Sequence, residues 1–253
     1  MNVYDTEALF GKNAVTEALR AELAADTLYV AAKQGGLTEI ITLAKERGAV
    51  VKEVPLDKLS ALCGNAKHQG VVLTIASAQY VSVEELLSHA EARGTKPLLV
   101  IADGIEDPHN LGAIIRSAES AGADGLIIPK RGGVSVNGAV FRASAGAAAH
   151  LKVCRATNLN DTVRFLKDNG VWLYCAAMDG EVYTKQDYTV GTAFVIGSEG
   201  RGVSRLLRQN CDAVVSLPMN GKINSLNASV SAGIFLYEAI RQRQSGLEKL
   251  NVR

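Results

Sequence analysis

The chain has 253 residues, a formal net charge of +1 and 47% hydrophobic residues, and its pI is about 7.7. These values are typical of a soluble globular protein with one or two domains that buries its core without disulfides. A nucleic-acid-binding domain often has a pI above about 9, so any RNA site here must be a local basic patch. We expect no signal peptide and no membrane span, and therefore a cytoplasmic protein, because the start lacks an apolar run and no apolar stretch approaches roughly 20 residues.

The cysteine pattern favours a reduced, metal-free protein. None of the four cysteines forms a C-x-x-C pair or lies beside histidines at the spacing of zinc ligands. Isolated cysteines in apolar surroundings are usually small core residues. We therefore expect no metal site and a structural role for Cys63, Cys154, Cys175 and Cys211.

Residues 1–76 predict a small α/β domain. Hydrophobic periodicity indicates a first helix from Thr6 to Leu23, with an apolar side that includes Leu9 and Val15. Apolar runs and periodicity then predict, in chain order, a strand at 27–31, a helix at 38–47, a strand at 50–54, a helix at 56–62 and a strand at 71–76. Residues 77–96 are more polar and predict one linker helix.

The second region, residues 97–253, alternates strands with helices, which is typical of a mostly parallel sheet covered on both faces. Ligands bind at the carboxyl ends of the strands in such sheets. We expect strands at 97–102, 125–128, 151–154, 171–176, 193–197 and 213–217, and helices at 109–121, 158–168, 202–209 and 225–243.

Residues 103–116 leave the first strand of this region and enter a helix. Asp107 is placed to cap the helix and Pro108 suits its first turn. Asn110 and Arg116 lie off the apolar stripe of this helix, in the early turns that face the strand ends. The segment alone is equally consistent with a well-capped helix that carries an exposed arginine.

Residues 194–204 contain a strand that breaks into a loop with three glycines in six positions. Glycines allow the backbone to approach a ligand closely, and a helix N-terminus supplies free N–H groups. The G-x-x-G-x-G spacing and the late position exclude the usual dinucleotide fingerprint, which follows the first strand. Glu199 is unexpected in a phosphate cradle, because its charge repels an anion.

Residues 217–229 end a strand at Pro218, continue through an Asn-Gly turn and enter a long apolar helix. Considered alone, Ser225 and Asn227 are interpreted as helix-capping residues.

Together, the three segments resemble the motifs of the SpoU (TrmH) family of RNA 2′-O-ribose methyltransferases, within the SPOUT class. The motifs read D-x-x-x-D-P-x-N-x-G-x-x-x-R at 103–116, I-G-S-E-G-x-G at 196–202 and L-P-M with S-L-N-A-S at 217–229. The resemblance spans about residues 97–240. Residues 11–15 and 67–71 are similar to the N-terminal L30e-like substrate-binding domain of the ribosomal RNA members, above all the bacterial 23S rRNA guanosine-2′-O-methyltransferases.

The resemblance implies an α/β fold with a C-terminal trefoil knot, a homodimer and S-adenosylmethionine as cofactor. It implies that a turn at 175–178 forms a third wall of the cofactor pocket. The cofactor residues implied are Ala176, Ala177, Ile196, Gly197, Ser198, Gly200, Gly202, Leu217, Met219, Ser225 and Leu226. The catalytic residues implied are Asn110, Arg116, Glu199, Ser225 and Asn227.

Methyl transfer to a ribose 2′-hydroxyl needs a positioned oxygen and an acceptor for its proton. In the family, the arginine at the place of Arg116 acts on this hydroxyl. Because a guanidinium is effectively always charged in proteins, we interpret Arg116 as a clamp on the adjacent phosphate that also stabilises alkoxide charge. Glu199 is the alternative base, while Asn110, Ser225 and Asn227 orient the ribose and Arg116.

RNA contact is expected from local clusters of basic residues. One cluster comprises Arg201, Arg205 and Arg208, which recur at i, i+4 and i+7 on one predicted helix. The candidate RNA-binding residues are Lys12, Lys67, His68, Arg131, Arg142, Arg201 and Arg205. For each cluster the alternative is an ordinary solvated surface.

Three other functions remain open at this point: a transfer-RNA methyltransferase of the same family, a non-catalytic RNA-binding assembly factor and a small-molecule methyltransferase. The N-terminal region favours ribosomal RNA over transfer RNA. The presence of all five implied catalytic residues argues against a scaffold. The basic clusters argue against a small-molecule substrate.

Overall fold

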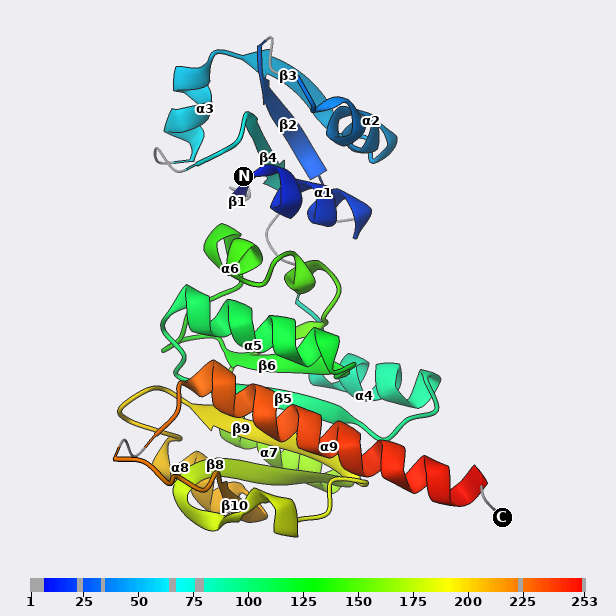
Figure 1. The fold of residues 1–253 in the computed structure, drawn as a ribbon, viewed down its shortest axis with the longest axis vertical. Coiled ribbons are helices and arrows are strands. Elements are labelled where there is room, and N and C mark those ends of the chain that lie inside the picture. The colour runs from blue at the N-terminus through cyan, green and yellow to red at the C-terminus, as the bar shows by residue number, and fades with distance from the viewer. Residues whose placement is uncertain are drawn as a thin grey trace. The chain divides into compact units, whose positions relative to one another are not determined.

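The computed structural model describes residues 7–21, 25–32, 35–63, 67–75, 80–222 and 225–251, without the side chains of Glu7, Ile75 and residues 246–251. The chain divides into two compact units (Figure 1). Unit 1 comprises Met1–Gln79 together with Val136–His150, and unit 2 comprises Tyr80–Ser135 and Leu151–Arg253. Among the described residues, no helix is both long and apolar enough to cross a membrane.

Unit 1 is a small α/β unit, as expected. Its four-stranded sheet has the order β1-β4-β2-β3, in which β2 and β3 are parallel and β4 is antiparallel to both β1 and β2. Leu59 and Val72 belong to one of its apolar clusters. The elements are β1 (Glu7–Phe10), α1 (Lys12–Arg20), β2 (Ala25–Ala31), α2 (Thr38–Glu46), β3 (Val50–Val54), α3 (Leu56–Leu62) and β4 (Val71–Ile75).

The predicted first helix is wrong in its first turn. Residues Glu7–Phe10 form β1, which pairs with β4, and the helix begins only at Lys12. Gly11 separates the two elements with a φ of +91°, a conformation that favours glycine. The buried stripe of α1 was predicted correctly from Val15 onward. Thr6 and residues 22–23, the predicted ends, lie outside the described residues.

Helix α6 (Gly138–Ala143) and the short η1 (Ala147–Ala149) were not predicted, and both belong to unit 1. A Cβ added to Gly138 would lie 2.6 Å from the carbonyl oxygen of Ala8, so α6 packs directly on the backbone of β1. The Arg142 guanidinium stacks on Phe10, 3.5 Å from the ring centroid. Segment Val136–His150 is therefore built into the N-terminal unit, although the chain on both sides of it belongs to unit 2.

Unit 2 contains a six-stranded sheet of order β10-β8-β9-β5-β6-β7. All its strand pairs are parallel, which confirms the expected fold class. Helices α5 and α9 lie together on one face (Figure 1), and α4, α7 and α8 pack on the other. The strands are β5 (Leu98–Asp103), β6 (Gly125–Pro129), β7 (Val153–Ala156), β8 (Val171–Val182), β9 (Gly191–Gly197) and β10 (Ala213–Ser216). The helices are α4 (Val83–Ala92), α5 (Pro108–Ser120), α7 (Leu159–Asp168), η2 (Tyr183–Lys185), α8 (Arg205–Asn210) and α9 (Ala228–Asn251). The trefoil knot stays a prediction.

Helix α5 forms as its sequence predicts. Pro108 is its first residue, and the side chain of Asp107 accepts a hydrogen bond of 2.9 Å from the N–H of His109. Its buried side includes Leu111, Ile114 and Ile115. The capped N-terminus fixes where the helix begins, and therefore which side chains of its first turns lie at the strand ends.

Two predictions in unit 2 are wrong in detail. Residues 175–178 do not form a turn, because β8 continues to Val182 and pairs with β10 across a register shift between Val214 and Val215. Helix α8 begins at Arg205 rather than at residue 202, since the glycine loop continues to that point. Arg201 therefore precedes the helix and does not share a helical face with Arg205 and Arg208.

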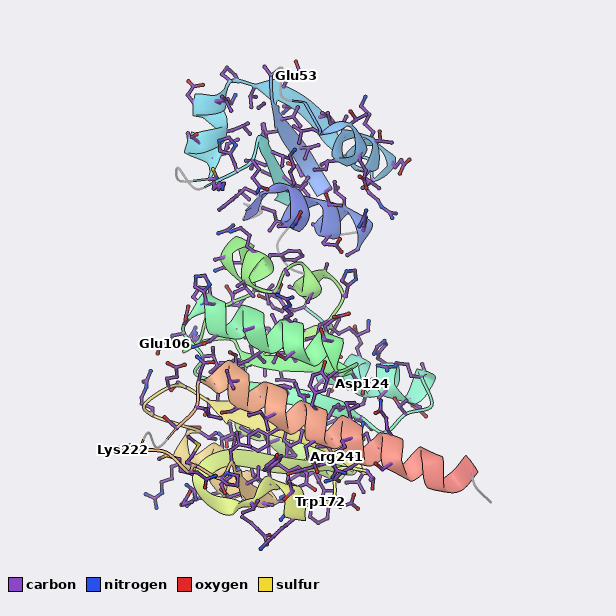
Figure 2. All side chains as sticks on the ribbon, viewed as in Figure 1. Glu53, Glu106, Asp124, Trp172, Lys222 and Arg241 are labelled. Carbon is purple, nitrogen blue, oxygen red and sulfur yellow. The ribbon has the colours of Figure 1, made fainter. Side chains whose placement is uncertain are left out.

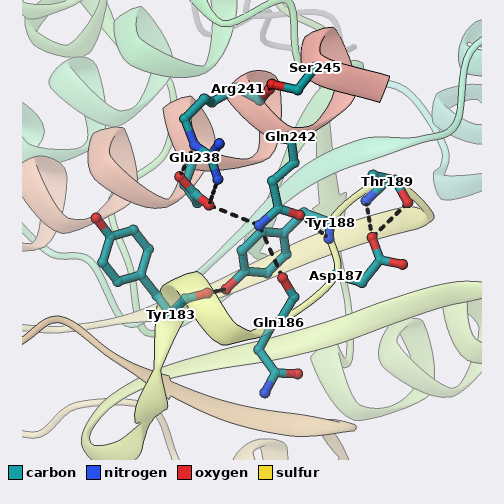
Figure 3. A network of polar contacts seen from close by, with 9 residues as sticks. All are labelled: Tyr183, Gln186, Asp187, Tyr188, Thr189, Glu238, Arg241, Gln242 and Ser245. Atoms are coloured by element: carbon teal, nitrogen blue, oxygen red, sulfur yellow. Dashed lines mark hydrogen bonds and ion pairs between the residues drawn. The ribbon is translucent and has the colours of Figure 1, made fainter. Parts of the chain in front are cut away.

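The C-terminal half of α9 is anchored by a network of polar contacts (Figure 3). Gln242 accepts a hydrogen bond of 2.9 Å from the N–H of Tyr188 and donates to the carbonyl of Gln186 and to Glu238. Burial raises the pKa of the Tyr188 hydroxyl, which donates to the carbonyl of Tyr183. Hydrogen bonds from Arg241 lower the pKa of Glu238.

The residue after Gln242, Arg243, donates hydrogen bonds of 2.8–2.9 Å to the carbonyl oxygens of Tyr188, Lys96, Pro97 and Val190. We expect Arg243→Ala to lower the free energy of unfolding by about 2–4 kcal/mol, because four carbonyls lose a charged donor and the Lys96 carbonyl keeps no other donor among the described residues. Urea denaturation measures this loss. Arg164→Ala is the matched control, because Arg164 and its partner Asp161 are both exposed, so that little stability is expected to be lost. Equal losses in the two variants would contradict the anchoring role.

Candidate active site

A pocket of about 460 Å³ lies where β9 and β10 end and α9 begins. The volume falls within the roughly 300–1,000 Å³ of small-molecule sites. Figure 2 labels Glu106 and Lys222, which follow β5 and β10, at this edge of unit 2, while Asp124, which precedes β6, lies away from it. The pocket therefore occupies the position that the parallel sheet predicts for a ligand.

The structure brings together all the residues that were predicted to bind the cofactor. They come from three separate segments of the chain and all line this pocket: Ala176, Ala177, Ile196, Gly197, Ser198, Gly200, Gly202, Leu217, Met219, Ser225 and Leu226. The expected third wall at 175–178 is present, but strand β8 supplies it instead of a turn. The role of these residues in binding stays a prediction.

The glycine loop between β9 and α8 is folded tightly back on itself. A Cβ added to Gly197 would lie 2.1 Å from the carbonyl carbon of Gly202, so no other residue fits there without displacing the backbone. The N–H of Gly202 donates a hydrogen bond of 2.9 Å to the carbonyl of Ser198. Gly200 and Gly202 have φ values of +88° and +67°. The glycines thus shape one pocket wall from backbone atoms.

Two contacts connect the first motif to this loop. The carboxylate of Asp103, at the end of β5, accepts a hydrogen bond of 2.7 Å from the N–H of Ser204, directly before α8. Glu106 forms an ion pair with Arg201. Asp103 was not predicted as a site residue, although a carboxylate at the end of a buried strand is a signal that could have identified it.

An ion pair on the pocket wall was also missed. Asp179 on β8 and Arg208 on α8 are joined at 2.7 Å, and both line the pocket. The hydrogen bond from Arg208 lowers the pKa of Asp179. Ala228, Ser231 and Phe235 of α9 line the pocket too, and their i, i+3, i+7 spacing is a helical signal that was not used.

The cysteines behave as expected of core residues. Cys63, Cys154 and Cys175 are buried, and Cys211 is half-buried. Burial raises the pKa of Cys154 to about 11. A hydrogen bond between the thiols of Cys175 and Cys211 lowers the pKa of Cys175 and raises that of Cys211.

Three predicted catalytic residues form one hydrogen-bonded cluster, although they lie far apart in the sequence. The side-chain nitrogen of Asn110 donates to Glu199 Oε1 at 3.1 Å. The side-chain nitrogen of Asn227 donates to the same Glu199 oxygen at 2.6 Å and to the Asn110 oxygen at 2.8 Å. Glu199 also lines the pocket. A carboxylate held by two amides next to a ligand pocket can serve as a proton acceptor.

The other two predicted catalytic residues lie outside this cluster. Ser225 lines the pocket. Arg116 is exposed on α5, does not line the pocket, and has no hydrogen bond or ion pair with another described residue. The structure therefore does not bring Arg116 to Glu199 within one chain.

The predicted RNA-binding residues fall into two groups. Some already have partners: Lys12 donates to the carbonyl of Gly36, Arg142 stacks on Phe10, and Arg201 pairs with Glu106. His68 accepts the N–H of Gly70 on Nδ1, so Nε2 of the neutral ring donates to Ser60. Lys67, Arg131 and Arg205 are exposed, and they form no hydrogen bond or ion pair within the described part of the chain.

The parallel sheet, the glycine-loop pocket at its carboxyl edge and the adjoining carboxylate–amide cluster define a ligand-binding α/β enzyme domain. Residues 97–237 match the model of the SpoU rRNA Methylase family, and residues 8–81 match that of the RNA 2′-O ribose methyltransferase substrate-binding domain. The chain belongs to the SpoU family of RNA methyltransferases.

Individual relatives agree with this assignment. An uncharacterized tRNA/rRNA methyltransferase of Mycobacterium sp. (strain KMS) is 46% identical over 95% of this chain and 78% of its own length. The AdoMet-bound rRNA methyltransferase from Sinorhizobium meliloti is similar with a TM-score of 0.80 and 26% identity, over 93% of this chain and 87% of that one. The A. aeolicus TrmH/SpoU tRNA modifying enzyme covers 65% of this chain and 85% of its own, with a TM-score of 0.54 and 27% identity.

Proposed function

We propose that this protein methylates the 2′-hydroxyl of a ribose in RNA with S-adenosylmethionine as methyl donor, and that its target is a guanosine of 23S rRNA in the cytoplasm. The observation that carries the proposal is the cluster of Asn110, Glu199 and Asn227 beside the pocket. It provides an oriented carboxylate at the edge of a cofactor-sized pocket.

The pocket fits S-adenosylmethionine, which supplies an activated methyl group on a positively charged sulfur. Ala176, Ala177, Leu217 and Leu226 give it apolar walls, and the loop from Gly197 to Gly202 gives it backbone polar groups. This combination suits a ligand with a flat base and a ribose. These residues would hold the cofactor.

Glu199 is the group we assign to remove the ribose proton. Its Oε1 is occupied by two amide donors, while no described residue donates to Oε2. Oε2 would accept the 2′-hydroxyl proton while the oxygen–methyl bond forms and the methyl–sulfur bond of the cofactor breaks, which would leave a neutral thioether. Glu199 would then release the proton to water. Arg116, exposed and unpaired among the described residues, clamps the neighbouring RNA phosphate and stabilises the charge that develops on the oxygen.

Ribosomal RNA is favoured over transfer RNA by the N-terminal unit. The rRNA methyltransferase from S. meliloti covers 93% of this chain, whereas the A. aeolicus tRNA modifying enzyme covers 65%. We propose residues 1–76 as the RNA-binding domain, 77–96 as the linker and 97–253 as the catalytic domain. Because Val136–His150 groups with unit 1, we extend the RNA-binding surface to that segment.

The test is transfer of labelled methyl from S-adenosylmethionine to protein-free 23S rRNA, 16S rRNA and bulk transfer RNA, each from cells that lack the enzyme. Alkali-resistant label on 23S rRNA alone is the expected result. Label on transfer RNA would keep the reaction and overturn the substrate. Cofactor binding without label on any RNA would favour the assembly-factor alternative, unless ribosomal particles added in a fourth reaction take up the label.

We further propose that the protein is a homodimer. Ser117 of α5 and Val230, Ile234 and Tyr237 of α9 line an open hollow of about 420 Å³, and Val230 and Tyr237 are exposed. Exposed apolar side chains of this kind are typical of an interface. Sedimentation equilibrium is expected to give twice the 26.7 kDa of one chain, and a monomeric mass at micromolar concentration would overturn the proposal.

A further inference from the structure

Ser229 lies two residues after Asn227, in the first turn of α9, and its hydroxyl donates a hydrogen bond to Asn227 Oδ1. The same oxygen accepts the backbone N–H groups of Ser229, at 2.9 Å, and Val230, at 3.3 Å. Asn227 is therefore the N-cap of α9. Ser229 is half-buried and does not line the cofactor pocket, but it lines the hollow between α5 and α9 that we propose as the dimer interface, so the mass of Ser229→Ala is measured alongside its rate.

The capping contacts determine which way the Asn227 amide points. Backbone N–H groups can only donate, so the amide oxygen must face the helix and the amide nitrogen must face away from it. That nitrogen meets the side-chain oxygen of Asn110 and Oε1 of Glu199. In the flipped orientation an amide oxygen would face the carboxylate of Glu199, and two acceptors would repel each other.

The orientation of Asn227 in turn determines that of Asn110. Because the Asn110 oxygen accepts from Asn227, its nitrogen is the group directed at Glu199, 3.1 Å away. The two amides thus donate to one oxygen of the carboxylate. The N-terminus of α9 sets the polarity of the whole cluster through Asn227.

We infer that Ser229 is a positioning residue: its hydroxyl helps to lock the Asn227 amide, so that Asn227 and Asn110 hold Glu199 Oε1 and leave Oε2 for the substrate. The inference rests on the proposed function, in which Glu199 accepts the ribose proton. Ser229 contacts neither cofactor nor RNA in this assignment and acts only through Asn227.

The first test is Ser229→Ala. We expect kcat to fall about three- to tenfold, as for the loss of one hydrogen bond, with an unchanged Kd for S-adenosylmethionine. Ser229→Thr, which keeps the hydroxyl, should restore kcat. Ser245→Ala is the matched control, because that serine lies on the same helix and its hydroxyl donates to the carbonyl of Arg241. A kcat unchanged in Ser229→Ala, or one that threonine fails to restore, overturns the inference.

The second test distinguishes positioning from a general effect on the helix. In an Asn227→Ala background the hydroxyl of Ser229 has no amide to orient, so adding Ser229→Ala should not lower the residual rate further. The same fold-loss in both backgrounds would show that Ser229 acts independently of Asn227 and would overturn the inference.

A third readout does not depend on activity. The side-chain NH₂ resonances of Asn227 and Asn110 should shift in Ser229→Ala and return in Ser229→Thr, since both amides belong to the cluster. Unchanged resonances would refute the locking role even in a protein that methylates RNA. Conversely, a wild-type protein that methylates no RNA would contradict the proposed function. The resonances would still report whether Ser229 orients the two amides.

Discussion

Arg116→Ala is expected to abolish methyl transfer, with a fall in kcat of at least about 10²- to 10³-fold, and to leave cofactor binding within about twofold. Arg116 is exposed on α5, does not line the pocket and makes no polar contact with another described residue, so its removal leaves fold and pocket intact. The variant loses the positive charge of Arg116, which we propose binds the RNA phosphate and stabilises the charge on the reacting oxygen. Labelled-methyl transfer measures kcat, and isothermal titration measures cofactor binding.

Arg164→Ala serves as the control, because Arg164 is an exposed arginine on α7 that pairs with Asp161 at the surface. It should retain wild-type transfer. Arg116→Lys keeps the charge but not the planar, bidentate donors, and an intermediate rate is expected. Loss of cofactor binding together with transfer in Arg116→Ala would contradict the assigned role.

Gly197→Ala is expected to weaken binding of S-adenosylmethionine more than 100-fold, on the order of 3 kcal/mol or more. The added Cβ would lie 2.1 Å from the carbonyl carbon of Gly202, and backbone on both sides of the loop must move to accept it. Such a shift displaces Ser198 and Gly200, which line the pocket. Titration calorimetry with the cofactor alone detects the loss without any RNA.

Gly221→Ala is the matched control for the glycine loop. Its added Cβ meets no atom of a described residue within 4 Å, and its φ is not in the left-handed region, so normal binding is expected. Normal cofactor binding by Gly197→Ala would show that the loop can rearrange and that its close approach to Gly202 is not needed for the site.

The elements that sequence analysis predicted well are those with strong local signals. Helix α5 has a capping aspartate, a proline in its first turn and an apolar stripe, and all three act within a few residues. By contrast, β1 is short, and Leu9 suits a strand as well as a helix. Only its pairing with β4, more than 60 residues away, makes it a strand. Helix α6 was missed because Gly138, its first residue, lies in a glycine-rich stretch that indicates a loop, and the packing of Gly138 on the backbone of β1 is not visible in the sequence.

The pocket residues were predicted from the motif resemblance. Hydrophobic periodicity alone predicts only turns and helix caps at the same residues. That interpretation was not false for Asn227, which does cap α9 while it holds Glu199. The polarity of the cluster depends on contacts among side chains that are 28, 89 and 117 residues apart, and no local pattern encodes it. The Asp179–Arg208 pair was missed for the same reason, because it joins a strand to a helix 29 residues later.

Because Val136–His150 is built into unit 1 while its flanking chain belongs to unit 2, three covalent connections join the two units instead of one. A protease cut at any single connection divides the chain into two fragments, and these are held together only by the packing of segments within a unit, such as α6 on β1. A fragment that ends at residue 79 lacks α6 and therefore uncovers Phe10 and the backbone at Ala8. Exchange of the N-terminal unit between relatives consequently requires two separate stretches of chain to be transplanted together.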